Sequence, residues 1–116
     1  MGGWQITVTG ENAEESPYVA LTLDLIRRFP KAGGQFQIEP DASSASYLWG
    51  AEWLLNGFSG REQIRVADWP SQSLQIDARF PEVIRSFPGR ISRLTDLGDS
   101  IMTAIALAPL AREKKL

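Results

Sequence analysis

Hydrophobic and polar residues alternate along several short segments of this 116-residue chain. In the clearest one, Leu74, Ile76 and Phe80 fall on one side, while Gln75 and Asp77 fall on the other. Strict alternation is typical of a half-buried β-strand, because successive side chains of a strand point to opposite faces. The pattern predicts strands at residues 4–10, 35–40, 61–69 and 73–80.

Three other segments have helical periodicity. Over residues 11–34, Ser16 is a suitable N-cap and Pro17 suits the first helical position. An apolar stripe follows at helical spacing and ends before Pro30. The stripe consists of Tyr18, Leu21, Leu25, Ile26 and Phe29. These features predict one long amphipathic helix near the start of the chain.

Two further helices are expected in the second half. Pro81 opens a short helix that Pro88 and Gly89 close. The last helix is expected to run from Ser92 or Asp96 to about Arg112, with Pro109 kinking or ending it. The residues predicted to share its buried face are Leu94, Leu97, Ile101, Ile105 and Ala108.

Residues 46–56 fit two descriptions. As a helix capped by Asp41, the segment has an apolar stripe at positions 47, 48, 51, 54 and 55, but Trp49 and Trp53 then project from the opposite side. As a strand, it places both tryptophans on one face, and it avoids Gly50 inside a helix, which is unfavourable. We favour the strand, with residues 56–60 turning it back as a hairpin.

This order of elements predicts one α+β domain spanning residues 1–116. Each strand has a single apolar face, as in antiparallel or mixed sheets, whereas strands buried on both sides are apolar throughout. We therefore expect a sheet of about four to five strands with two main helices packed on one face. A ferredoxin-like variant is one possible topology.

The composition removes several kinds of chemistry. The chain has no cysteine and no histidine. Disulfides, thiolate nucleophiles and zinc–thiolate sites are therefore absent, and so is the usual general base near neutral pH. We expect no catalytic residue, no cofactor and no metal site. Carboxylate, lysine or tyrosine chemistry is what would remain for an enzyme.

The charge and hydropathy restrict partners and location. Twelve basic against fourteen acidic residues give a net charge of −2, which does not suggest nucleic-acid binding. The first ten residues resemble no signal peptide, and the longest apolar run, IALAPLA, is too short to cross a bilayer. We expect a cytoplasmic protein without membrane contact, in which a homodimer is possible.

Exposed aromatic and arginine side chains often anchor protein interfaces. The segment 47–55 has more apolar residues than one buried face needs, and Trp69 lies at a strand end between charged and loop residues. The candidate partner-binding residues are Trp49, Trp53, Arg65, Trp69 and Arg79. Their expected partner is another protein.

Other residue groups offer weaker alternatives. Arg79, Arg85, Arg90 and Arg93 lie close together with phenylalanines between them, so segment 79–93 is the best candidate for nucleic-acid binding. Glu39 and Asp41 lack the spacing of a calcium loop. The acidic stretch 11–15 is best explained by the dipole of the following helix.

By elimination, the sequence favours a non-catalytic protein-binding module, such as an inhibitor, adaptor or immunity-type protein. A nucleic-acid-binding α+β domain is the first alternative. A small-molecule-binding protein, or a carboxylate-based enzyme with an aromatic-lined pocket, is the second.

Overall fold

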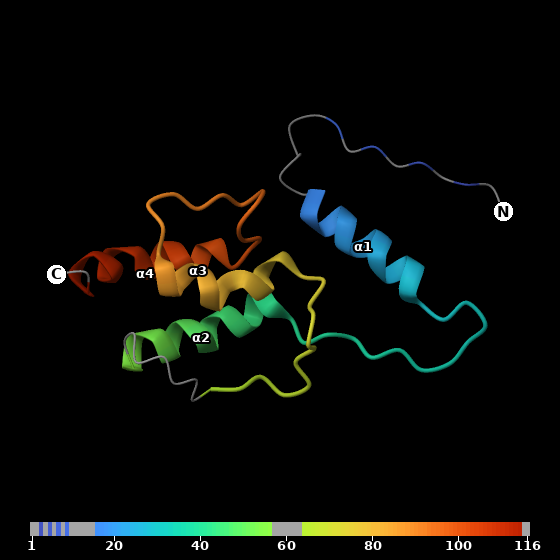
Figure 1. Cartoon of the computed structure of the whole chain (residues 1–116), viewed down its shortest axis with the longest axis horizontal. Coiled ribbons are helices and arrows are strands. Elements are labelled where there is room, and N and C mark those ends of the chain that lie inside the picture. Colours follow the sequence, from blue (N-terminus) through green and yellow to red (C-terminus); the bar gives the residue numbers. More distant parts are fainter. Residues whose placement is uncertain are drawn as a thin grey trace.

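The computed structural model describes residues 3, 5, 7 and 9 and the ranges 16–56 and 64–114. These residues form helices and connecting segments, with no β-strand among them (Figure 1). The elements are α1 (Ser16–Arg28), α2 (Ala42–Asn56), the 3-10 helix η2 (Ile76–Arg79), α3 (Phe80–Ser86) and α4 (Ile101–Lys114). The predicted α+β sheet is therefore wrong, and with it the ferredoxin-like topology. That residues 1–116 form one domain stays a prediction.

Helices α2, α3 and α4 form a layer in which α2 packs against both of the others. They run in the same general direction, while α1 lies apart from them (Figure 1). Ser46 of α2 and Thr103 of α4 share a hydrogen bond of 2.8 Å between their hydroxyls, so the two helices begin at the same end of the layer. We call this layer of three helices the helical layer.

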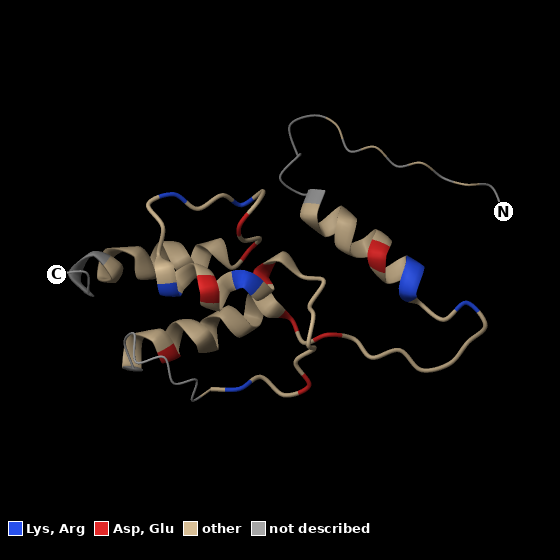
Figure 2. Cartoon of the chain, viewed as in Figure 1, with Lys and Arg blue, Asp and Glu red and all other residues tan. Residues whose placement is uncertain are grey.

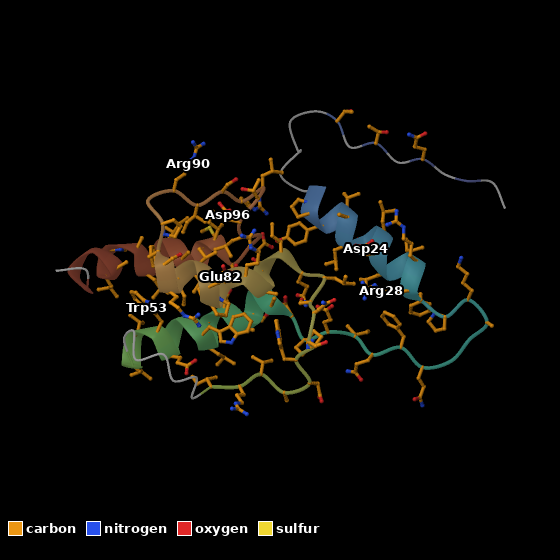
Figure 3. The ribbon with its side chains drawn as sticks, viewed as in Figure 1. Asp24, Arg28, Trp53, Glu82, Arg90 and Asp96 are labelled. Carbon is orange, nitrogen blue, oxygen red and sulfur yellow. The ribbon has the colours of Figure 1, made fainter. Side chains whose placement is uncertain are left out.

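The core lies inside the helical layer. Its buried members are Trp53, Phe80, Val83, Ile84, Phe87, Leu97, Ala104, Leu107 and Ala111. Trp53 of α2 lies between α2 and α3 (Figure 3), with its ring 5.9 Å from that of Phe87. Phe87 ends α3 in the left-handed conformation, and its N–H donates to Val83 O. The aromatic side chains thus join α2 to α3.

Helix α1 forms where the sequence predicts it. It begins at Ser16, with Pro17 in its first turn, and ends at Arg28 shortly before Pro30. An extended segment then leads back to α2. Gly33 and Gly34 in it have φ angles of +84° and +138°, which residues with a Cβ rarely adopt.

The strand favoured for residues 46–56 is wrong, because this segment lies within helix α2. Asp41 caps the helix, as the alternative interpretation expected: its carboxylate accepts hydrogen bonds from Ser43 N and Ser44 N at 3.1 and 3.3 Å. Gly50 is tolerated because α4 lies close to it. A Cβ there would lie 3.2 Å from Thr103 Cγ2.

The strand predicted at 73–80 is also wrong. Residues 76–79 form η2, and Asp77, expected on the exposed face, is 3% exposed. Residues 35–40 and 64–69 form no regular element, and Ile38, expected to point inward, is 75% exposed. Most of the strand predicted at 4–10, the acidic stretch 11–15 and the turn at 57–60 lie outside the described residues.

Helix α3 forms where predicted, over Phe80–Ser86 with Pro81 in its first turn. Helix α4 begins only at Ile101, and it buries a different face from the predicted one. Leu97 is fully buried as expected, but Ile105 is 59% exposed, and Ala104 and Leu107 are buried in its place.

Charged residues are scarce in the two longest helices of the layer. Glu52 is the one charged residue of α2, and residues 101–111 of α4 carry none (Figure 2). Even so, none of the described helices is both long and apolar enough to cross a membrane.

Candidate active site

A cleft of about 220 Å³ lies between α1 and the end of the helical layer where α2 and α4 begin. It combines apolar side chains of α1 with carboxylate, amide and hydroxyl groups of the helical layer. Its lining residues are Pro17, Tyr18, Leu21, Asp41, Ser43, Gln75, Ile76, Asp77 and Asp99. Among the residues that the structure describes, this is where polar groups from distant parts of the sequence converge.

Asp77 is buried at one side of this cleft and holds the start of α4. Its Oδ1 accepts a hydrogen bond of 3.0 Å from Ser100 N and another, very short, from Ser100 Oγ. Ser100 immediately precedes α4 and is itself 1% exposed. The carboxylate thereby satisfies N-terminal donors of α4 and interacts favourably with its dipole. These contacts explain how a carboxylate can be buried here.

Tyr18 connects α1 to the same loop. Its hydroxyl oxygen accepts a 2.7 Å hydrogen bond from Asp99 N. Gly98 lies beneath this contact, where a Cβ would be 2.6 Å from Asp77 Oδ2 and closer still to Tyr18 Oη. Only glycine fits at this position. Burial raises the pKa of Tyr18, against the opposing effect of its hydrogen bond with the Asp99 backbone.

Asp99 is an exposed carboxylate of the cleft that does not cap a helix, whereas Asp41, which is also exposed, caps α2. Its side chain is 61% exposed, and its Oδ1 lies 2.7 Å from Arg93 Nη2. This ion pair orients the carboxylate, while the hydrogen bond from the Asp99 backbone N–H to Tyr18 holds the Asp99 backbone against α1. A partly exposed ion pair of this kind contributes little to stability, so it serves mainly to orient the side chain.

Gln75, which lines the cleft, joins the loop before η2 to the segment 39–42. Its side-chain amide donates to Glu39 Oε2 at 3.0 Å and to Pro40 O at 2.7 Å, while its Oε1 accepts from Ala42 N at 2.8 Å. Glu39 also accepts from Ser73 Oγ at 2.5 Å. The loop before η2 is therefore tied to the start of α2.

The two carboxylates at this end of α2 are held in their ionised forms. Burial opposes ionisation of Glu39, but hydrogen bonds from Ser73, Gln75 and Leu74 outweigh it, so its pKa is lowered. The Ser44 hydroxyl and the N–H groups at the helix start lower the pKa of Asp41, against a smaller effect of burial. Each of these carboxylates is engaged in structural contacts.

No group of three or more acidic side chains within the described ranges has an arrangement suited to a metal ion. A calcium site at Glu39 and Asp41 has no support either, since both carboxylates accept hydrogen bonds from protein donors. The chemistry that the cleft offers is acid–base chemistry by a carboxylate, with neighbouring hydroxyl and amide groups.

The predicted aromatic site residues lie elsewhere, in and around the core. Trp49 is half-buried, with its ring 5.0 Å from that of Trp69 in an edge-to-face arrangement and 6.4 Å from that of Phe80. Trp53 is 6% exposed. Packing in and around the core is therefore sufficient to explain the presence of both tryptophans, and no binding partner has to be invoked. That they contact a partner stays a prediction.

The predicted arginine sites, Arg65 and Arg79, are both exposed. Arg65 lies in the irregular segment before Asp68, and the Arg79 guanidinium donates to Thr95 O at 2.8 Å. Within segment 79–93, Arg85 and Arg90 are exposed, whereas Arg93 pairs with Asp99. The arginines therefore do not form one group devoted to a ligand. A role for Arg65 and Arg79 in partner binding stays a prediction.

Sequence reasoning did not bring together into one site the residues that build the cleft, namely Tyr18, Gln75, Asp77, Gly98 and Asp99. One signal for part of this set was present. The run Gly98-Asp99-Ser100 directly precedes the charge-free segment 101–111, and a serine before an apolar run is a typical helix N-cap. Nothing local in the sequence indicated that Asp77 would reach this N-terminus, since 23 positions separate it from Ser100.

Comparison with known proteins points to one kind of enzyme. The chain is 30% identical over 131 residues to a 3-phosphoshikimate 1-carboxyvinyltransferase of Pseudomonas syringae pv. tomato, covering 97% of the chain and 30% of that protein. It is 34% identical over 126 residues to the enzyme of that name from Laribacter hongkongensis, covering 92% and 27%. No protein-family model and no solved structure matches the chain.

The chain thus spans about 30% of the length of the curated relatives it matches. A third enzyme of the same name, from Idiomarina loihiensis, is 26% identical over 110 residues. Similarity to these transferases along nearly the whole chain contradicts the expectation of a non-catalytic binder of the inhibitor, adaptor or immunity type. The elimination failed because a missing imidazole or thiol does not prevent carboxylate chemistry. The chain is similar to part of a carboxyvinyltransferase.

Proposed function

We propose that this chain supplies part of the active site of an enzyme that transfers a carboxyvinyl group to an acceptor of the 3-phosphoshikimate type. The observation that carries the proposal is the cleft carboxylate of Asp99, oriented by Arg93 at 2.7 Å and open to solvent. The similarity to transferases of this name over 92–97% of the chain supports it.

The reaction requires a proton acceptor. When an acceptor hydroxyl attacks the carboxyvinyl carbon, a C–O bond forms, the bond from that carbon to the donor's leaving group breaks, and the hydroxyl proton passes to a base. Asp77 is occupied by Ser100, and Asp41 caps α2. Asp99 is therefore the proposed general base, and its proton can pass on to the leaving group.

The cleft lining also suggests which part of the acceptor it receives. Among its described lining residues there is no lysine or arginine, and three are aspartates. A phosphate would be repelled there, whereas hydroxyl groups can donate to the carboxylates and accept from uncharged donors. We assign the cleft to the hydroxyl-bearing part of the acceptor and place its anionic groups outside this lining.

The first test is binding. Backbone amide NMR signals of the full chain are recorded while 3-phosphoshikimate is added. We expect shifts at Tyr18, Gln75 and Asp99 that saturate together. An unbranched dicarboxylic acid of similar charge serves as the control and should leave these signals in place. Saturating shifts confined to other residues would contradict the proposed site.

The second test is turnover. The chain is assayed together with the part of the Laribacter hongkongensis enzyme that it does not match, with 3-phosphoshikimate and a carboxyvinyl phosphate as donor. Product is detected by mass spectrometry. Asp99→Asn is expected to lower kcat by roughly 10²–10⁴-fold while acceptor binding changes little, as for loss of a general base. Glu82→Gln, at an exposed position of α3, is the matched control. Equal rates for Asp99→Asn and the parent chain would refute the assignment of Asp99.

The cytoplasmic location expected from the sequence is retained as part of this proposal. A multiply charged phosphorylated acceptor does not cross a bilayer unaided, so its transferase is expected in the compartment where the acceptor is made.

A further inference from the structure

Helix α2 has an apolar face that touches none of the other described helices. Trp49 and Trp53 point into the helical layer, and the residues on the opposite side of α2 face solvent. Tyr47 is 68% exposed and Leu55 is 81% exposed. This outer face of α2 consists of Tyr47, Leu48, Ala51, Leu54 and Leu55.

Helix α4 repeats this arrangement. Ala104, Leu107 and Ala111 are buried, and the residues on the opposite side are exposed although none of them is polar. Met102 is 67% exposed. The outer face of α4 consists of Met102, Ile105, Ala106, Pro109 and Leu110.

The two outer faces adjoin. Helices α2 and α4 touch where Ser46 and Gly50 meet Thr103 and Leu107. Leu54 lies one turn beyond Gly50, and Leu110 lies one turn beyond Leu107, so both outer faces border this line of contact on the side away from α3. Together they form one uncharged surface, the outer face of the helical layer.

We propose that the outer face of the helical layer binds the part of the carboxyvinyltransferase that has no counterpart in this chain. A helix that is apolar on every side is normally buried on every side, and a contiguous exposed apolar patch marks an interaction site. The curated relatives are about three times as long as the region they share with this chain, so they hold enough additional polypeptide to cover it.

The absence of charge on the outer face also fits this occupant. An uncharged surface binds an uncharged partner surface more favourably than a charged one. Charged groups of a partner would lose their hydration on binding and find no opposite charge here. The relation to the cleft is direct, since the same α2 and α4 begin at the cleft. The inference rests on the proposed function for the identity of the partner, whereas the existence of an interface rests on the exposed apolar face.

The test mixes the full chain with a second polypeptide, made from the Laribacter hongkongensis enzyme without the region matched by this chain. Size-exclusion chromatography with light scattering should show a 1:1 complex. Leu55→Glu and Met102→Glu should each weaken it at least tenfold, because each buries a charge without a partner. Both positions are exposed, so circular dichroism should show unchanged helix content.

Gln72→Glu is the matched control, because it adds the same charge at an exposed position outside the helices. It should leave the complex intact. Four results would overturn the proposal: no complex, a complex insensitive to both outer-face variants, a homodimer of this chain that Leu55→Glu dissociates, or binding of neutral lipid vesicles in preference to the polypeptide. A sensitive complex without turnover would refute the proposed function alone.

Discussion

The face of α2 that packs on α3 and α4 and the face on its opposite side carry similar residues in different surroundings. The inner face has Ala42, Trp53 and the close contact at Gly50, and the outer face has Tyr47 and Leu55. Hydrophobicity therefore does not distinguish them. What distinguishes the inner face is shape: small residues allow α4 to approach, and the tryptophans fill the space beside α3.

The largest effect should come from removing an inner tryptophan. Trp53→Ala leaves a cavity in the core and is expected to lower the free energy of unfolding by about 3–5 kcal/mol. Leu55→Ala on the outer face should change it by less than about 0.5 kcal/mol. Urea denaturation followed by circular dichroism measures both values. Similar losses for the two variants would mean that the two faces are equally buried in solution.

The next effect concerns the close approach of α4. The Cβ of any side chain introduced at position 50 would lie 3.2 Å from Thr103 Cγ2 and 3.3 Å from Leu107 Cδ1. Gly50→Leu is therefore expected to destabilise the fold by about 1–3 kcal/mol, although leucine is the better helix former.

Ala51→Leu is the matched substitution on the outer face, and it should be neutral or slightly stabilising. Thermal unfolding of both variants is the measurement. Greater stability of Gly50→Leu would show that α2 and α4 are farther apart than described.

A smaller effect is expected from the hydrogen bond between the two helices. The Ser46 hydroxyl donates to Ser43 O at 2.6 Å, so its bond with Thr103 Oγ1 uses the Thr103 proton. A double-mutant cycle with Ser46→Ala and Thr103→Ala should give a coupling energy of about 1 kcal/mol. Additive effects of the two substitutions would exclude a significant bond between the hydroxyls.

The smallest effect is a change in pH dependence at the start of α2. The pKa of Asp41 is lowered in the folded chain, so its ionised form stabilises the fold above the unfolded pKa. This stabilisation is lost as the pH falls through the folded value. Asp41→Asn retains a good N-cap without titrating, so the stability should fall less steeply between about pH 5 and pH 3.

Urea denaturation across this range measures the slope. Glu39, whose pKa is also lowered, continues to contribute in the variant, so some acid sensitivity should remain. An unchanged slope would mean that Asp41 is not held in its ionised form by the cap.

The sequence sufficed to locate the elements whose ends have local causes. Helix α1 has a proline in its first turn and another shortly after its end, and α3 begins at Phe80 beside Pro81. The apolar stripe predicted for α1 is only partly buried, since Ile26 is 61% and Phe29 58% exposed. For α2 the sequence showed that positions 47, 48, 51, 54 and 55 share one side of a helix, but that side was assumed to be the buried one. The structure buries the tryptophans and exposes the stripe, so the preference for a strand rested on a wrong assignment of the inner face.

The alternating segment 73–80 failed for a different reason. Alternation describes the order of residue types, but the backbone there follows contacts with distant residues. Gln75 bonds to the chain at Glu39 and Ala42, and Asp77 bonds to Ser100. Three hydrogen-bonded residues, between 23 and 36 positions away, determine the path. The pattern of eight consecutive residues cannot reveal contacts with residues so far away in the sequence.

The sequence by itself determined where α1 and α3 form, that Asp41 can cap a helix, and that any chemistry must do without imidazole or thiol. The tertiary structure alone decided which face of α2 is buried and which exposed carboxylate of the cleft is not used as a helix cap. The physical reason is that caps and periodicity act within a few residues, whereas burial and the pairing of Asp77 with Ser100 and of Asp99 with Arg93 depend on which segments meet in space.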